Sequence, residues 1–465
     1  MTVPKKGEKI FTLSDAELHS ILKRREKHIE LDPGMGGVSP RLLDNLLKSD
    51  SELVSLDLAI TAACNFRCGH CYKPNEEWNK QVLDFATLSR VVEEAVQILG
   101  TRFFVITGGE PLMYNSEGRD YFDVVDKIIE VSNGRGFKPH VLTFSDVALI
   151  NEQTAAKLAT RKVALCLKRD TLDHAIQNKI LGVSRGSEQM AAGYQTLFAA
   201  GYGKNPELAV SVNTVLRKGD CNTLNGSVDL HVWVKENGME HSIVPIHHCG
   251  GAIDEDQDLN PLEVKVLYDI LSAIDEIKFN DVWKVHSPFP KDKTCNRPGR
   301  GVHARVTGKV AACSESPLID PYVFGNINEI SLTTMIRSDG FRKFQQEFAS
   351  REGKYICNPE VCDLNRHNIC RGGCATRSAY SVINPETGQL EQNTNMLSYS
   401  RGREDPMCPG WAVLAQMQGV LREGVYKKIA DRLLGESMML DPQLKGRISE
   451  KILTEFAALK KKPQP

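Results

Sequence analysis

The 465-residue chain lacks both a long apolar run and a bias toward one sign of charge. Lys and Arg together number 58 and Asp and Glu number 59, so a net charge of −1 gives no electrostatic reason to bind nucleic acid or an anionic membrane. Apolar stretches such as FFVI and AVLA are far shorter than a membrane span, and the N-terminal residues lack the apolar core of a signal peptide. The sequence therefore predicts a cytoplasmic protein with neither a nucleic-acid nor a membrane partner.

Cysteine is the residue whose distribution needs an explanation. The chain has 13 cysteines, of which three lie at 64–71, seven at 295–408, and Cys166, Cys221 and Cys249 are scattered. Because thiols stay reduced in the cytoplasm, these cysteines favour metal ligation over a disulfide framework.

Strand-like runs alternate with helical segments along the first 280 residues. The runs lie at 54–60, 102–108, 139–144, 162–168, 208–216 and 241–246, and helical segments between them include 88–99, 122–132 and 189–201. This alternation indicates a parallel α/β sheet, which right-handed crossovers would curl into a partial (β/α)6 barrel of the TIM type.

The composition divides the chain into four predicted parts. Residues 1–53 form a helical extension, 54–284 the barrel, 285–412 a small irregular Cys-rich domain with little core of its own, and 413–465 a helical tail.

Three cysteines directly follow the first predicted strand, at the carboxyl end of the sheet, where α/β barrels carry their chemistry. Cys64, Cys68 and Cys71 have the spacing C-x3-C-x2-C, which chance would produce about 0.01 times in this composition. Structural zinc would need four ligands, commonly with a C-x2-C pair at each end. Thiolates also hold iron–sulfur clusters, and three ligands on a four-iron cluster would leave one iron open to a substrate or cofactor.

The segment ACNFRCGHCY, followed by VITGGEPL at the end of the second strand, resembles the radical S-adenosylmethionine (SAM) superfamily over residues 54–250. The resemblance implies a [4Fe–4S] cluster on the three cysteines and His70 near the adenine of SAM. It also implies that the methionine amine is received by Thr107, Gly108, Gly109 and Glu110. Glycines would let the backbone approach the ligand, and the Glu110 carboxylate would accept a charge-assisted hydrogen bond.

The chemistry implied by this resemblance is reductive. One electron, supplied by an external donor such as flavodoxin or ferredoxin, cleaves SAM into methionine and a 5′-deoxyadenosyl radical, which removes a hydrogen atom from the substrate.

A second resemblance covers about residues 290–412, where the cysteines read C-x12-G-x4-C and then C-x4-C-x7-C-x3-C. This layout is similar to the SPASM domain, which carries two auxiliary iron–sulfur clusters, both expected to be [4Fe–4S]. If the ligand pattern of that domain is carried over to this chain, the first auxiliary cluster would be held by Cys295, Cys313 and Cys374. The second would be held by Cys357, Cys362, Cys370 and Cys408.

Two departures from the SPASM pattern leave alternatives open. The usual inner spacing is C-x2-C-x5-C, and many members carry a further cysteine that is missing here between Cys295 and Cys313. The first auxiliary cluster would then have an open iron, a non-cysteine ligand such as His303, or a cysteine from elsewhere. A zinc site at 357–374 is the other interpretation.

Several scattered polar residues are further candidates. Lys168 shares a strand face with Cys166 and would reach the carboxylate of SAM, while Cys166 also fits a small buried hydrophobe. Asn213, in the middle of a strand, would touch the cofactor or be a hydrogen-bonded core residue. His247 and Cys249, after the sixth strand, are the candidate catalytic residues for a proton or hydrogen-atom transfer or for the missing cluster ligand, although an ordinary loop fits as well.

The resemblance implies an oxidoreductase, and the favoured substrate is a ribosomally made peptide bound between the barrel mouth and the auxiliary domain. Dehydrogenation or epimerisation of a small sugar or aminocyclitol, and maturation of a sulfatase-like protein, are the alternatives. Residues 1–53 are too few for a winged-helix leader-binding domain, so a separate leader-binding protein would be the partner. An iron–sulfur electron carrier is the non-enzymatic alternative, but such a carrier has no use for a methionine site.

Overall fold

The computed structural model describes residues 51–73, 81–246, 261–281, 301–316, 322–349, 381–383, 390–392 and 423–460. None of the helices in these ranges is long and apolar enough to cross a membrane.

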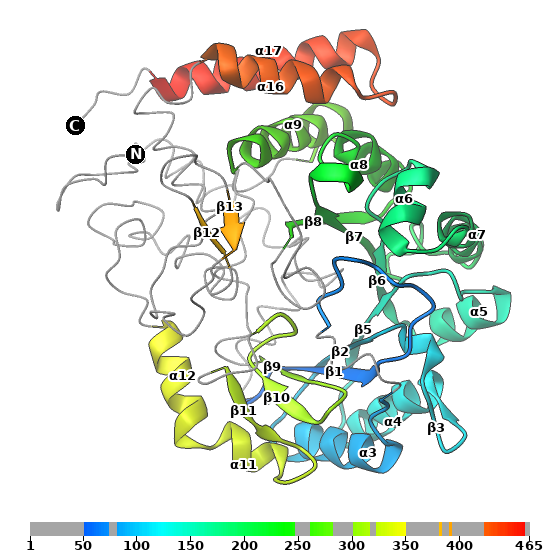
Figure 1. The fold of residues 1–465 in the computed structure, drawn as a ribbon. Coiled ribbons are helices and arrows are strands. Elements are labelled where there is room, and N and C mark those ends of the chain that lie inside the picture. Colours follow the sequence, from blue (N-terminus) through cyan, green and yellow to red (C-terminus); the bar gives the residue numbers. More distant parts are fainter. Residues whose placement is uncertain are drawn as a thin grey trace.

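Six parallel strands form the centre of the fold, in the order β1-β2-β5-β6-β7-β8 (Figure 1). They are β1 (Ser55–Thr61), β2 (Phe103–Gly108), β5 (His140–Ser145), β6 (Ala164–Lys168), β7 (Val210–Leu216) and β8 (Glu240–Pro245). All six predicted strands are confirmed, each within two residues of its expected bounds. Because all six run parallel, their carboxyl ends meet along one edge of the sheet.

Helices cover the outer face of this sheet (Figure 1). They are α3 (Phe85–Glu93), which continues into the π-helix η3 (Glu94–Ile98), α4 (Tyr121–Gly134), α5 (Glu152–Thr160), α6 (His174–Leu181), α7 (Gly186–Ala199), α8 (Ser227–Glu236) and α9 (Pro261–Phe279). Side chains cap the N-termini of several of these helices. Asp120 forms a capping box with Asp123 at the start of α4. Asp84, Asn151 and Asp173 each accept a hydrogen bond from a backbone N–H in the first turn of α3, α5 and α6, respectively. Short elements in the connections are the 3-10 turns η4 (Pro111–Met113) and η5 (Gly219–Cys221) and the strand pair β3 (Asn115–Ser116) and β4 (Arg119–Asp120).

The two faces of the sheet are packed differently. Leu58, Phe104 and Ile106 point to the helices and belong to the main hydrophobic core. Alternate residues such as Val105 and Cys166 point to the opposite face and form a small separate cluster. At the carboxyl ends of the strands this inner face becomes polar, with Thr107, Lys168 and Asn213.

The Cys-rich region shares a sheet with the barrel. Strand β9 (Gly301–Ala304) pairs in parallel with β1, and β10 (Lys309–Ala311) and β11 (Val323–Asn326) follow antiparallel, so that the sheet has nine strands. The sequence predicted a separate irregular domain from 285 onward, because three or four residues per strand give no readable alternation. The pairing also covers the edge of β1.

Hydrogen bonds fasten this region to the barrel helices. Glu94, at the start of η3, accepts from the backbone N–H of Thr333 (3.1 Å) in helix α11 (Leu332–Ile336), and Arg90 donates to the carbonyl of Ile327 (2.5 Å). Helix α12 (Asp339–Ala349) follows α11, and strands β12 (Ser381–Ile383) and β13 (Leu390–Gln392) pair with each other.

The predicted helical tail is confirmed over 423–460. Helices α16 (Glu423–Gly435) and α17 (Pro442–Lys460) form a hairpin beside α9 (Figure 1). Tyr426, Leu433 and Ile448 are buried in one apolar cluster with residues of α8 and α9. Of the predicted N-terminal extension only residues 51–53 lie within the described ranges, and the four domain boundaries stay predictions.

Candidate cofactor site

The three cysteines of the first group lie where the sequence predicted, on the loop that follows β1 at the carboxyl edge of the sheet. Phe66 anchors the loop because its side chain is only 3% exposed within the main core. The Arg67 backbone N–H donates to the carbonyl of Leu181 at the end of α6 (2.9 Å), and its guanidinium donates to the carbonyl of Cys64 (2.7 Å). The loop is therefore held in place from the α6 side by the protein itself.

The Gly-Gly-Glu segment after β2 holds the loop from the other side. Gly109 N–H donates to the Thr61 carbonyl (2.6 Å), and Glu110 N–H donates to the Ala63 carbonyl (2.8 Å). A Cβ atom on Gly109 would lie 2.0 Å from the Ala63 oxygen, and one on Gly108, whose φ is +139°, would lie 2.3 Å from the Thr61 oxygen. The sequence explained these glycines by close approach to a ligand, whereas the structure shows close approach to the chain's own cysteine loop.

Two buried carboxyl groups meet beside this segment. Glu110, 1% exposed, accepts hydrogen bonds from Ser145 Oγ (3.1 Å) and from the backbone N–H of Asp146 (2.8 Å) and Leu112 (3.1 Å). Burial raises the pKa of both Glu110 and Asp146, and for Glu110 the adjacent Asp146 charge raises it further. Without a cation the pair therefore retains a proton near neutral pH, and a bound ammonium group would replace it.

Positively charged groups converge on the opposite side of the loop. His70, between Cys68 and Cys71, has Lys168 Nζ 2.9 Å from Nε2 and Arg217 Nη1 3.1 Å from Nδ1. Burial and these two cations hold the pKa of His70 well below its usual range, so its ring is neutral. Lys168 also pairs with the buried Asp170 at 2.9 Å.

The remaining predicted cofactor residues lie on the inner face at the same edge. Asn213 is half-buried and pairs in register with Lys168 across β6 and β7. Thr107 is buried, and its hydroxyl makes no hydrogen bond within the described part of the chain. Cys166 is buried among Val105, Ala164 and other apolar side chains, which fits the small-hydrophobe interpretation.

The cysteine thiols are half-buried, and burial raises the pKa of Cys64 to about 11 and of Cys68 to about 12. A bound metal would remove these protons, because thiolates are the ligands. No three His, Cys, Asp or Glu side chains in the described ranges surround a point suitable for a single metal ion. In an iron–sulfur cluster each thiolate would bind a different iron atom.

The donor set therefore fits the expected cofactors. Three thiols stand on one anchored loop, an acid pair able to take an ammonium lies on one side, and two cations lie on the other. The methionine part of SAM carries both an ammonium and a carboxylate, which these two sides would match. The roles of Glu110, Lys168 and the other individual residues stay predictions.

Many of the predicted residues lie outside the described ranges. They are His247, Cys249, Cys295, Cys357, Cys362, Cys370, Cys374 and Cys408. Cys313 follows β10, and its Sγ lies 3.1 Å from Ser316 Oγ. His303, the suggested non-cysteine ligand, is buried on β9 opposite Asp57, with Nδ1 3.8 Å from Asp57 Oδ2.

Sequence reasoning missed Asp146, Asp170 and Arg217. Each follows the end of a strand: Asp146 comes directly after β5, Asp170 two residues after β6 and Arg217 directly after β7. Because strand ends at this edge surround the same site, a search for charged residues at these positions would have found all three.

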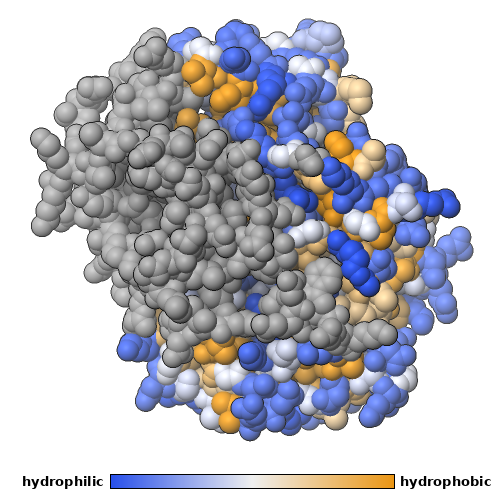
Figure 2. All heavy atoms as spheres, viewed as in Figure 1, coloured by the Kyte–Doolittle hydropathy of each residue, from blue (hydrophilic) through white to orange (hydrophobic). Residues whose placement is uncertain are grey.

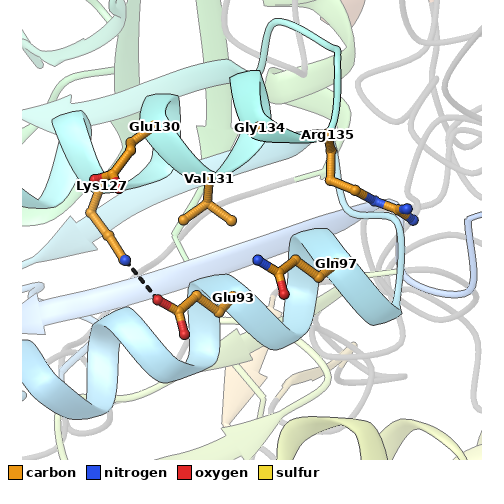
Figure 3. Close-up of a pocket in the computed structure, with 7 residues that line it drawn as sticks. All are labelled: Glu93, Gln97, Lys127, Glu130, Val131, Gly134 and Arg135. Atoms are coloured by element: carbon orange, nitrogen blue, oxygen red, sulfur yellow. Dashed lines mark ion pairs between the residues drawn. The ribbon is translucent and has the colours of Figure 1, made fainter.

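A groove elsewhere on the molecule has a different character. It lies between α3–η3 and α4 on the outer helical layer, where Lys127 pairs with Glu93 at 2.6 Å and Arg135 lies at one end (Figure 3). It is formed by helices on the outer face of the sheet and takes no part in the cysteine loop.

Comparison with known families decides the relationship. Residues 58–220 match the radical SAM superfamily, and residues 295–371 match SPASM, an iron–sulfur cluster-binding domain. The chain belongs to the radical SAM superfamily and carries a SPASM domain. The cofactors of these two domains, SAM and [4Fe–4S] clusters, agree with the prediction.

Relatives and solved structures extend this comparison. A GTP 3′,8-cyclase of Edwardsiella ictaluri is 29% identical over 201 residues, which cover 42% of this chain and 55% of that protein. Native anSMEcpe with bound AdoMet shares the fold with a TM-score of 0.58 and 15% identity, covering 81% of this chain and 100% of the other. The structure of Streptococcus suis SuiB bound to precursor peptide SuiA shares the fold with a TM-score of 0.53 and 15% sequence identity, covering 83% of this chain and 82% of SuiB. The chain thus spans about half the length of the first of these relatives.

Replacing Gly109 with alanine should displace the cysteine loop. The added Cβ would lie 2.0 Å from a backbone oxygen, which no side-chain rotation can relieve. We expect the variant to bind about four fewer iron atoms per chain than wild type after anaerobic reconstitution, while far-UV circular dichroism shows the fold retained. Gly134→Ala is the matched control, because its Cβ would meet no atom within 4 Å. Wild-type iron content in Gly109→Ala would contradict the role of this contact.

Binding of SAM should release a proton from the acid pair. Glu110 and Asp146 retain one proton near neutral pH, and the incoming ammonium displaces it, so affinity should fall as the pH is lowered below neutral. Calorimetric titrations at one pH, in buffers of different ionisation enthalpy, should show release of about one proton per SAM bound. Glu110→Gln should abolish the release, whereas Glu117→Gln, at an exposed turn, should keep it. If the binding enthalpy of the wild type is the same in all buffers, no proton is released, and the proton proposed for the Glu110–Asp146 pair is ruled out.

Proposed function

We propose that this protein cleaves SAM reductively and uses the resulting radical for the oxidative modification of a ribosomally made peptide. One observation carries the proposal. At the carboxyl edge of a parallel sheet, the Gly-Gly-Glu segment is hydrogen-bonded to the start of the cysteine loop, through the carbonyls of Thr61 and Ala63. When bound, the cluster and SAM supply a 5′-deoxyadenosyl radical that abstracts a hydrogen atom from the substrate.

The residues of the chain would bind and orient the cofactor. Glu110 and Asp146 would take the ammonium, and Lys168 and Arg217 would face the carboxylate, so that the methionine part is fixed at both polar ends. The ring of His70 lies between the two cations and would pack near the adenine. His247 and Cys249 stay the candidate residues for a proton or hydrogen-atom transfer.

A SPASM domain with two auxiliary clusters suits a net oxidation. After hydrogen abstraction the substrate radical must lose one electron and one proton; an auxiliary cluster would be a nearby acceptor for the electron, and the proton would pass to a basic side chain or solvent. The expected reaction is therefore the loss of two hydrogens from the peptide, which makes the enzyme an oxidoreductase. The fold shared with SuiB, whose structure contains a precursor peptide, supports a peptide as the substrate.

A nucleotide substrate is the second candidate, because the chain resembles GTP 3′,8-cyclases in sequence. Matches to these cyclases cover from 42% to 61% of this chain, at 25–32% identity. A cyclisation in which the product retains all hydrogens would leave auxiliary clusters without an electron to accept. Sugars, aminocyclitols and sulfatase-like proteins remain alternative substrates for the same radical chemistry. An iron–sulfur electron carrier remains the non-enzymatic alternative function.

The function can be tested by following 5′-deoxyadenosine and substrate mass together. The reduced, reconstituted enzyme is incubated with SAM and, in separate reactions, with peptides encoded beside its gene, GTP, or small polyols. We expect 5′-deoxyadenosine release coupled to the loss of two hydrogens from a peptide. Cys68→Ala should lower the release at least 100-fold, whereas Cys166→Ala and Cys221→Ala should retain it, because these two thiols lie outside the loop.

The outcomes separate the candidates. Wild-type cleavage by Cys68→Ala would overturn the radical SAM site, and turnover of GTP or a polyol with no change in any peptide would overturn the peptide substrate. If the wild-type protein binds iron but releases no 5′-deoxyadenosine, the result would favour the electron-carrier function.

A further inference from the structure

Lys168, which is half-buried, and Asp170, which is buried, form a pair of opposite charges against the cysteine loop. Lys168 is the last residue of β6, and Asp170, 0% exposed, follows two residues later. The ammonium lies 2.9 Å from a carboxylate oxygen of Asp170 and 2.9 Å from Nε2 of His70, which stands between Cys68 and Cys71. The pair therefore contacts the cysteine loop through His70, which is next to Cys71 and two residues from Cys68 in the chain.

We propose that Lys168 and Asp170 set the reduction potential of the cluster on this loop in opposite directions. The proposal rests on the proposed cluster at Cys64, Cys68 and Cys71, and deepens it. Reduction adds one negative charge to the cluster, so a nearby fixed cation stabilises the reduced form and a nearby anion destabilises it. Lys168 raises the potential, and Asp170 moderates that effect.

The surroundings keep both charges in place. Asp170 accepts hydrogen bonds from the backbone N–H of Val215 (3.1 Å) and from Gln177 Nε2 (3.3 Å), which position its carboxylate in the absence of any cofactor. Asp170 is inaccessible to solvent, His70 is 8% exposed and the Lys168 side chain is 22% exposed, so water only partly screens these charges from the loop. At such a site charges act over several ångströms with less screening than in bulk water.

The two charges have opposite effects on negative charge added at the loop. A reduced cluster is one charge more negative than its oxidised form, so Lys168 favours reduction and Asp170 disfavours it. Arg217, on the other ring nitrogen of His70, adds a second cation to this side.

The test is an EPR-monitored redox titration of the reconstituted full-length enzyme in the absence of SAM. We expect Lys168→Met to shift the midpoint potential of the loop cluster to more negative values and Asp170→Asn to shift it to more positive values. Lys168→Arg, which keeps the charge, should stay near the wild type. Omitting SAM separates this effect from any loss of cofactor binding.

The amino end of the same strand offers a matched control. Lys162, two residues before β6, pairs at 2.7 Å with Glu207 on the surface, so Lys162→Met removes the same charge far from the loop and should leave the potential unchanged.

The measured potentials distinguish an electrostatic effect of Lys168 and Asp170 from a structural disturbance. Opposite shifts for Lys168→Met and Asp170→Asn support the proposal, because a merely structural disturbance has no reason to reverse sign. If Asp170→Asn fails to fold, the contrast among Lys168→Met, Lys168→Arg and Lys162→Met still decides. A loop cluster with wild-type potential in Lys168→Met overturns this inference alone. Absence of any cluster dependent on Cys64, Cys68 and Cys71 in the wild type overturns the proposed site itself.

Discussion

The contact between Gly109 and the start of the cysteine loop is the constraint on which the site depends. Two strand ends are joined there by short backbone hydrogen bonds, with no room for even one methyl group between them. The strands β1 and β2 are neighbours in parallel register, so the sheet brings the two loops to the same point. The sheet thus gives the loop a fixed position that does not depend on a bound cofactor.

Charge is distributed around that loop in two opposing groups. The acid pair stands at the ends of β2 and β5, and Lys168 and Arg217 stand at the ends of β6 and β7. The net charge of the whole chain is −1, so this local separation is invisible in the composition. The coloured part of the face in Figure 2 mixes hydrophilic and hydrophobic residues. Glu110, Asp146 and Arg217 are buried and Lys168 is half-buried, so these charges add little to the surface.

Much of this could be predicted from the sequence. The six strands were readable because they alternate with helices and most are rich in β-branched or aromatic residues, and the first cysteine group stood out by its spacing. The pairing of β9 with β1 could not be predicted, because four residues such as GVHA carry no periodicity and their partner lies more than 240 residues away. The contact of Gly109 with the Ala63 carbonyl could not be predicted either, since the sequence shows that a glycine is needed but not which chain atoms approach it. Asp146 and Arg217 were overlooked although their positions directly after strands marked them.

The most direct test of the account is an anaerobic crystal structure of the reconstituted protein with SAM, using anomalous scattering at the iron edge. The account predicts iron atoms on Cys64, Cys68 and Cys71, with the SAM ammonium against Glu110 and Asp146 and its carboxylate on the side of Lys168 and Arg217. Iron absent from this loop, or SAM bound away from the carboxyl edge of β1 and β2, would contradict it.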